Sequence, residues 1–403
     1  MVRIKPFAAL RPRPELAAKI CELPYDVMSS AEARAIAAGN PLSFLHVSKP
    51  EIDLPAGTDP YAPEVYAQGK ENLQRLMAEG VLYQDSTPRF YLYRQLMGSH
   101  AQTGLVAGAS CEDYLNGVIK KHELTRPDKE DDRVRHMEAL NAQTGPAFLV
   151  YPAQPAIDKV VAEQTSRPPE VDFTAPDGVR HSAWSVADES ARIIQDTFHQ
   201  LPAAYIADGH HRSAAAGRVF KSRAGQGHSA WFLSVIFPHN QVKILPYNRV
   251  LKDLNGHSAA QLQEALDKVF EFIPGPGQAP AAKHELGLYL EGKWRKLRFR
   301  PEKVSAPKAA DRLDATLLQQ HVLEPLFGID NPRTSSRINF VGGIRGSAEL
   351  EKLVSGGEYA CAFALFPTGI EDLMAIADAG DIMPPKSTWF EPKLRDAMFS
   401  HLL

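Results

Sequence analysis

Short apolar runs of strand length alternate with longer helical segments along the whole chain, and this alternation limits the fold more than any other feature. Strands that alternate with helices favour a parallel sheet, whereas short turns such as residues 238–240 are typical of antiparallel hairpins. Both patterns occur in this chain. The sequence therefore predicts mixed sheets with flanking helices, an α/β to α+β fold.

Local signals predict the bounds of several elements. Ser29, with Glu32 three residues later, forms a capping box, and Gly39 ends the helix that follows. Asp188 is expected to cap another helix, and a hairpin is expected across residues 291–293. Strands are expected at 43–47, 90–95, 105–110, 147–151, 203–207, 231–237, 242–245, 337–341 and 359–366, and helices at 61–79, 188–199, 212–220, 258–270, 311–326, 348–354 and 371–379.

The length of 403 residues is too great for one simple core. We expect two regions: an N-terminal α/β region at 1–250, and a C-terminal α/β region at 251–403 that packs on the first and contributes the loop of Lys386. The alternating prolines and glycines at 274–277 are the best candidate for a linker, because they support neither helix nor strand.

Charge and cysteine content exclude several classes of protein. The net charge of −3 offers no field that would gather nucleic acid, and no run reaches the roughly 18 apolar residues of a spanning helix. The start of the chain has no apolar secretory segment, and Cys21, Cys111 and Cys361 are too widely spaced for a zinc-thiolate site or a disulfide framework. We expect a soluble cytoplasmic protein that binds a small molecule but neither nucleic acid nor membrane; a homodimer is compatible with this.

The most informative motif is Asp208-Gly209-His210-His211-Arg212, a glycine turn between an apolar strand and an alanine-rich helix. Free N–H groups and the helix dipole favour an anion at such a turn. Arg212 adds a planar fork for phosphate or carboxylate, and the histidines add donors or a base near neutral pH. Asp208 can orient a histidine, bind a cation or accept a proton. The alternative interpretation is a helix cap with two surface histidines.

A second group of polar residues begins at Lys120 and includes His122, Glu123 and Arg126. A His-Glu pair among cations suits a general base, or an anion site with a base beside it. The alternative is a solvated charged helix, which is the usual structure of such a run.

Near the end of the chain, two consecutive prolines precede Lys386 and Ser387. Prolines stiffen the backbone, so the lysine and the hydroxyl lie on a fixed loop, as a phosphate contact requires. The alternative is a rigid tail that packs Trp389 and Phe390. Asp26, before the Ser29 cap, is either a pocket residue or a turn residue.

Three other patterns carry no chemistry. The glycines at 342–346 lack the lysine of a P-loop and the spacing of a dinucleotide fingerprint. The sequence at 71–75 has the form of a ParB nucleotide motif, but it lies in an expected amphipathic helix and precedes the Asp208 turn. Arg126 stands where a zinc protease motif that began at His122 would need its second histidine.

Four stretches, taken together and in this order, resemble the bacterial family known as domain of unknown function 1015. They are Leu23-Pro24-Tyr25-Asp26-Val27, Tyr114 with Ile119-Lys120-Lys121-His122-Glu123, Ala207-Asp208-Gly209-His210-His211-Arg212, and Ala377-Asp378-Ala379-Gly380 with Met383-Pro384-Pro385-Lys386-Ser387-Thr388. The resemblance covers essentially the whole chain. It implies a core that is ParB/sulfiredoxin-like.

The turn itself is similar to the phosphate turn of that fold, whose members bind or hydrolyse nucleotides. Some free-serine kinases use a related Asp-Gly-His-x-Arg turn for phosphoryl transfer, with a glutamate as base. The resemblance therefore implies ligand-binding roles for Asp208, His210 and Arg212, while Glu123 is the candidate base on chemical grounds alone. His210 stands where sulfiredoxin has its catalytic cysteine, and the DNA-binding helix-turn-helix of ParB is not evident.

Two hypotheses of function follow. The first is a nucleotide-dependent phosphotransferase, a kinase that acts on a small hydroxylated, amino acid-like metabolite with a nucleoside di- or triphosphate and Mg²⁺. The second is a ParB-like nucleotide-binding regulatory protein without substantial turnover; metal-assisted hydrolysis through His210, His211 and Asp208 is a third. For the first, the expected catalytic residues are Glu123, His122 and Asp208, the metal ligand is Asp208, and the phosphate or ligand contacts are Gly209, His210, His211, Arg212, Lys120, Arg126, Lys386 and Ser387.

Overall fold

The computed structural model describes residues 1–403, and the chain divides into two compact units. The first unit is Met1–Val242 together with Pro392–Leu403, and the second is Lys243–Glu391. The sequence had placed the last twelve of these residues in the C-terminal region. They belong to the first unit because Ser400 pairs with Leu10, Asp396 pairs with Glu22, and strand β21 (His401–Leu402) pairs with β7 (Ala142–Gln143).

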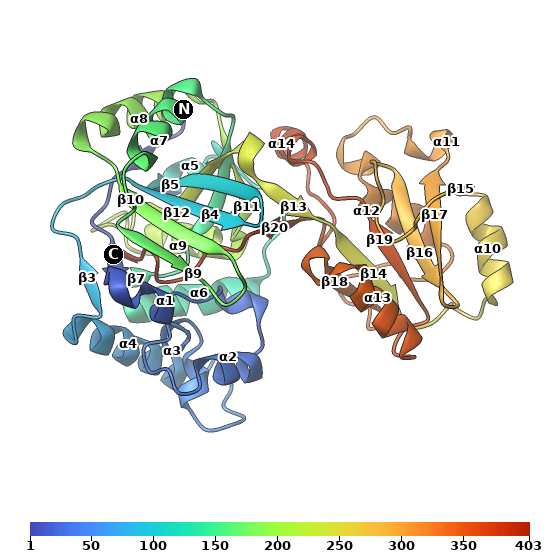
Figure 1. Cartoon of the computed structure of the whole chain (residues 1–403), viewed down its shortest axis with the longest axis horizontal. Helices are drawn as coiled ribbons and strands as arrows, with labels where there is room; N and C mark the ends of the chain where they lie inside the picture. Colours follow the sequence, from blue (N-terminus) through green and yellow to red (C-terminus); the bar gives the residue numbers. More distant parts are fainter. The chain divides into compact units, whose positions relative to one another are not determined.

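A nine-stranded mixed sheet forms the centre of the first unit (Figure 1). Its order is β6-β11-β8-β12-β5-β4-β10-β9, and β1 pairs with β5. The pairs β11–β6 and β12–β8 are parallel and the others are antiparallel, which confirms the predicted mixed sheet. The strands are β1 Ile4–Lys5, β4 Tyr91–Met97, β5 His100–Ser110, β6 Ile119–Lys120, β8 Ala147–Tyr151, β9 Val171–Thr174, β10 Arg180–Ser185, β11 Ala204–Asp208 and β12 Trp231–Pro238.

One continuous apolar core joins this sheet to the helices packed on it. Leu149 of β8, Ile206 of β11 and Phe232 of β12 contribute from the sheet, while Phe198 of α8 and Val219 of α9 contribute from the helices. Each of these side chains is almost fully buried, so the core fixes where α9 begins relative to β11. The helices of this unit are α1 Ala17–Ile20, α2 Ser30–Ala37, α3 Leu45–Ser48, α4 Pro63–Ala78, α5 Cys111–Leu115, α6 Pro127–Leu140, α7 Pro155–Thr165, α8 Asp188–Gln200 and α9 His210–Ser222, and β2 Leu10–Pro12 pairs with β3 Leu82–Gln84.

Local signals predicted some helix ends correctly and others wrongly. The Ser29–Glu32 capping box is present, with both reciprocal hydrogen bonds. Asp188 does not cap α8, because the cap position is Ala187. Asp188 lies in the first turn, where its negative charge interacts favourably with the positive end of the helix dipole. The expected strand at 43–47 is also wrong. Residues 45–48 form α3 because backbone N–H groups bond to carbonyls three or four residues earlier.

The second unit contains a six-stranded antiparallel sheet of order β15-β17-β16-β19-β14-β18. The 274–277 segment lies inside this unit, between β15 and β16, and so does not link the two units. The expected helix at 311–326 is interrupted, because a 3-10 turn at Ala310–Arg312 and a π-helical turn at Gln319–Leu323 flank α12. The elements are β13 Lys243–Leu245, β14 Tyr247–Leu251, α10 Ala259–Asp267, β15 Phe270–Ile273, β16 Glu285–Leu290, β17 Lys293–Phe299, α11 Pro301–Val304, α12 Asp314–Leu318, β18 Ile338–Gly342, α13 Gly346–Ser355, β19 Cys361–Leu365, α14 Ile370–Asp378 and β20 Trp389–Glu391.

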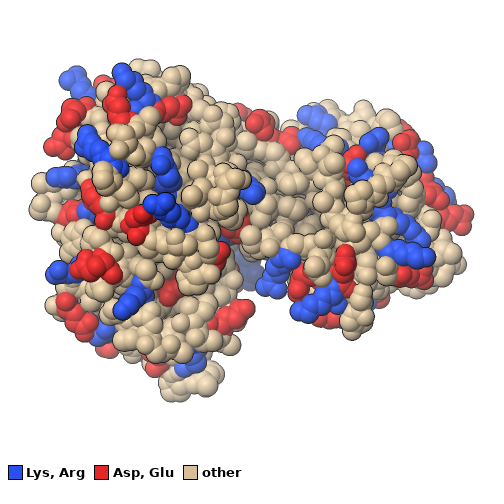
Figure 2. All heavy atoms as spheres, viewed as in Figure 1, with Lys and Arg blue, Asp and Glu red and all other residues tan.

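Charged side chains of both signs are interspersed on the face shown in Figure 2, in keeping with the net charge of −3. Cys21, Cys111 and Cys361 are all buried and form no disulfide. Each of the helices is too short or too polar to cross a membrane.

Candidate functional site

A glycine turn links the end of β11 to the start of α9. Gly209 has φ 88° and ψ 31°, a left-handed conformation that favours glycine. A Cβ atom there would also lie 3.2 Å from Ala147 Cα and 3.2 Å from the Arg212 guanidinium carbon. No side chain caps α9. Its first turn therefore presents backbone N–H groups and the positive end of the dipole, as expected for an anion site.

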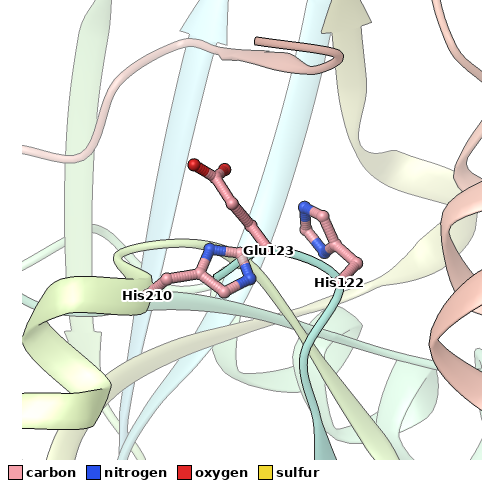
Figure 3. Close-up of side chains that lie close together, drawn as sticks. All are labelled: His122, Glu123 and His210. Atoms are coloured by element: carbon pink, nitrogen blue, oxygen red, sulfur yellow. The ribbon is translucent and has the colours of Figure 1, made fainter. Parts of the chain in front are cut away.

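Strand pairing brings a second segment to this turn. β6 runs parallel to β11, with Ile119 opposite Ala204 and Lys120 opposite Tyr205. The residues after β6 therefore run beside the end of β11. There, the potential ligand atoms of His122, Glu123 and His210 all lie within 4.8 Å of one another (Figure 3). The structure thus groups two sets of residues that the sequence had kept separate.

The two imidazole rings of this group meet edge to face, with centroids 4.5 Å apart and planes at 88°. Burial lowers the pKa of His122 to about 4, although the Ile206 backbone and the Asp208 charge both raise it. Burial, and then the neighbouring His122, also hold the pKa of His210 well below its usual value. Both rings are therefore neutral near pH 7, and each retains a nitrogen lone pair.

Asp208 is held by two neighbours. Its Oδ1 accepts a hydrogen bond of 2.7 Å from the Gly209 N–H, and its Oδ2 lies 2.9 Å from Lys393 Nζ. Burial alone would raise the pKa of this carboxyl, but the charges of Lys393 and Arg212 hold it well below its usual value. A carboxylate this acidic is a weak proton acceptor at neutral pH. The contacts favour a role for Asp208 in anchoring the turn.

Arg212 is buried and directed at protein groups. Its Nη1 donates to the Pro146 carbonyl, while Nη2 lies 3.8 Å from Asp26 Oδ2 and 3.9 Å from Asp208 Oδ1. Burial lowers the pKa of Arg212, but the charges of Asp26 and Asp208 outweigh it and the pKa is raised. These contacts join the turn to the short 3-10 helix at Tyr25–Val27, and a contact between Arg212 and a ligand stays a prediction.

A second buried carboxyl, Asp396, lies behind Arg212. Burial raises its pKa to about 8, despite the opposing charge of Arg212. A cavity of about 20 Å³ adjoins both residues and is also lined by Tyr25, Arg133 and His136. That volume holds about one water molecule, and the polar lining suits it. Arg212 therefore belongs to a compact buried polar cluster around this small cavity.

Residues 4–316 match the model of a family described as a protein of unknown function, DUF1015. The chain belongs to the DUF1015 family. No curated protein matches it. The matched span includes His122, Glu123 and the Asp208 turn, and it ends before Lys386 and Lys393.

Several solved structures are remotely similar to this DUF1015 chain. A free serine kinase in complex with AMP has 15% identity and a TM-score of 0.35, over 70% of this chain and 88% of that one. A conserved hypothetical protein from Pyrococcus furiosus has 15% identity and a TM-score of 0.35, over 71% and 91%. SbnI with a C-terminal truncation, from Staphylococcus aureus, has 10% identity and a TM-score of 0.40, over 72% and 85%.

The other predicted site residues of the DUF1015 chain lie in different parts of the fold. Lys120 lies on β6 opposite Tyr205, and His211 is half-buried, with its pKa lowered mainly by burial. Arg126 points outward and pairs with Asp128 at 2.8 Å. In the second unit, Lys386 Nζ lies 5.4 Å from the centre of the Tyr247 ring, and Ser387 Oγ donates to the Pro384 carbonyl at 2.8 Å. A contact between that loop and a ligand at the turn stays a prediction.

Sequence reasoning assigned no role to Lys393 or Asp396. No local pattern could have linked Lys393 to Asp208, because 185 residues separate them. Asp26 had been left open as a pocket or turn residue. It lies in the 3-10 helix Tyr25–Val27, 3.8 Å from Arg212 Nη2, so it is a turn residue; a role in a ligand pocket stays a prediction.

Proposed function

We propose that this protein is a nucleotide-dependent phosphotransferase that acts on a small hydroxylated, amino acid-like metabolite. One observation carries the proposal: Glu123 and His122 meet His210 at the uncapped start of α9, with ligand atoms within 4.8 Å. Anion donors and a proton acceptor therefore share one place. Phosphoryl transfer requires this combination, since its catalysis is mostly positioning and charge stabilisation.

The phosphate groups of the nucleotide would bind at the first turn of α9. The N–H groups of His210 and His211 belong to that turn, and Lys120 on the neighbouring β6 would add a cation. Mg²⁺ prefers oxygen ligands, and the site offers the carboxylate of Asp208. When bound with the nucleotide, Mg²⁺ would neutralise charge on the phosphate oxygens. Lys393 already holds one oxygen of Asp208, so that carboxylate would offer the ion its other oxygen.

The proton of the acceptor hydroxyl would pass to Glu123. His122 has a pKa of about 4 and is therefore a weaker acceptor near pH 7 than its position alone suggests. A hydroxyl within about 2.6–3.2 Å of the Glu123 carboxylate would meet the geometry of general base catalysis. The turn's resemblance to that of free-serine kinases points to a hydroxy amino acid as acceptor.

The test is a transfer assay on the full chain with Mg²⁺ and either ATP or ADP. L-serine, L-threonine and L-homoserine would be the acceptors, and ³¹P NMR would detect the phosphorylated product. We expect Glu123→Gln to lower turnover by roughly 10²–10⁴-fold, as for loss of a general base, while nucleotide binding persists. His199→Gln, an exposed change on α8, is the matched control and should leave turnover unchanged.

Two outcomes would contradict the proposal. Failure of the folded protein to bind any nucleotide would remove its basis. Nucleotide binding without transfer to any acceptor would instead support the ParB-like regulatory hypothesis, in which no base is needed.

A further inference from the structure

The imidazoles beside the turn are buried without the hydrogen bonds that buried histidines usually make. The Ile206 backbone lies close enough to the His122 ring to affect its pKa, but neither ring nitrogen meets the distances and angles of a hydrogen bond, and His210 Nε2 also has no partner. The side chains are only 2% and 8% exposed. Native proteins leave few buried polar atoms in this state, and those that remain call for a specific explanation.

Two other buried histidines in the same unit, His136 and His181, each have a partner at one ring nitrogen, although His181 Nε2 and His401 Nδ1 have none. His136 Nε2 lies 2.9 Å from the Val47 carbonyl oxygen, and His181 Nδ1 lies 2.7 Å from the Tyr93 hydroxyl. Each of these rings is therefore fixed by a protein group at one nitrogen. His122 and His210 differ because their nitrogens lie near each other and near a carboxylate.

We propose that His122, Glu123 and His210 together bind one divalent transition-metal ion. Their potential ligand atoms lie within 4.8 Å of one another, and Figure 3 shows the three side chains grouped, two from the segment after β6 and one from the start of α9. Two imidazole nitrogens and one carboxylate oxygen suit Zn²⁺, Mn²⁺, Fe²⁺ or Co²⁺, and leave coordination positions open. Mg²⁺ favours oxygen ligands and fits this set poorly.

The surroundings support a cation here. The negative charge of Asp208 acts on both rings, which favours positive charge between them, whereas Lys121 opposes it at His210. A carboxylate that binds a metal through one oxygen keeps its second oxygen free, so Glu123 can still accept a proton. The catalytic meaning of this ion rests on the proposed function, but its binding does not.

The experiment uses the full chain after treatment with EDTA and desalting. Separate samples receive ZnCl₂, MnCl₂, CoCl₂ or MgCl₂, are desalted again, and are analysed for metal by mass spectrometry. We expect about one equivalent of a transition metal per chain and no retained Mg²⁺. His122→Gln combined with His210→Gln should abolish retention. His199→Gln should retain the metal fully, and so should His211→Gln, because the ring of His211 is not part of the group.

The visible absorption spectrum of the Co²⁺-loaded wild type gives a second measurement, independent of whether the double variant folds. Bands typical of nitrogen and oxygen ligation support the site. A folded wild-type protein that retains no transition metal overturns the inference, as does equal retention by the folded double variant. Nucleotide binding with Mg²⁺ alone in such a metal-free protein would leave the proposed function intact. Metal retention without nucleotide binding would sink the proposed function and leave the metal site standing.

Discussion

Two buried polar clusters, one in each unit, differ in how their groups are hydrogen-bonded. In the second unit, the buried Glu285 on β16 accepts from Arg298 at 2.7 Å and pairs with Lys296 at 2.8 Å, both on the neighbouring β17. In the first unit, the nitrogens of His122 and the Oδ1 of Asp396 are buried without a hydrogen-bond partner.

The difference separates groups that stabilise a fold from groups that carry chemistry. A buried charge with partners on an adjacent strand is satisfied within its own sheet. Unsatisfied polar groups cost stability and persist mainly at functional sites. In this protein such atoms occur in both units, and those of His122, His210, His211 and Arg212 lie around the turn after β11, which is where the proposed site lies.

The largest expected effect is that of Arg212→Met. The change removes the cation next to Asp26 and Asp208, although Lys393 still pairs with Asp208, and removing one partner from a buried charge cluster typically costs about 3–5 kcal/mol. Urea denaturation would measure the loss in the free energy of unfolding. Arg192→Met, at an exposed pair with Asp196, is the control and should leave stability nearly unchanged. A similar small effect at Arg212 would show that the cluster does not depend on it.

The first unit should lose stability in acid before the second. The pKa of His122 is about 4 in the fold, against about 6.5 in an unfolded chain, so the unfolded state binds the proton first. Protonation of His122 therefore does not affect the free energy of unfolding above about pH 6.5. As the pH falls from there towards 4, the free energy of unfolding falls by on the order of 3 kcal/mol because of this one ring. Hydrogen exchange of peptides from β6 and β11 would follow the loss. If His122→Gln shows the same pH profile, the ring is not its cause.

Glu285 in the second unit should also lose its stabilising effect in acid, but for a different reason. The fold keeps this carboxylate charged, whereas it keeps the His122 ring neutral. Hydrogen bonds from Lys296 and Arg298 lower its pKa to about 2. Its contribution is therefore complete above about pH 4.3 and is lost as the pH falls towards 2. Glu285→Gln should cost about 1–2 kcal/mol at pH 7, less than Arg212→Met, because Arg298 is half-exposed and can turn to water. Exchange in β16 and β17 that is equally fast in the variant and the wild type at pH 7 would contradict this.

The smallest expected effect comes from a motif that both units share. Ser29 caps α2 in the first unit and Ser258 caps α10 in the second, each with a complete capping box. Ser29→Ala and Ser258→Ala should each cost about 1 kcal/mol, because both leave an N–H group at the helix start without its acceptor. Thermal unfolding of the two variants would measure this. Unequal losses would reveal that one unit unfolds before the other.

Local patterns predicted the elements that carry the site. The apolar run Ala147–Tyr151 is β8, the run before Asp208 is β11, and the glycine turn leads into α9 as expected. The meeting of Glu123 with His210 depends on the pairing of β6 with β11, which no local pattern specifies. Sequence reasoning could name the residues but not group them.

The wrong strand and the unforeseen contacts of Arg212 have different origins. The expected strand at 43–47 contains apolar residues of the right type, but hydrogen bonds between backbone groups three or four residues apart make residues 45–48 α3. The carboxylates that act on Arg212, Asp26 and Asp396, are distant from it in sequence, so a short sequence window does not contain them. A contact between Arg212 and a ligand stays a prediction.

The return of the chain to the first unit has a consequence for how this architecture could have arisen. Lys243 and Glu391, the first and last residues of the second unit, are partners in the antiparallel pair of β13 and β20. The chain therefore enters and leaves the second unit through neighbouring strands, as in a domain inserted into a loop of another domain. A shortened gene that joins residue 242 to residue 392 would need only a turn of about two to five residues to close the gap. Deletion of the whole second unit therefore requires only one short connection in the first.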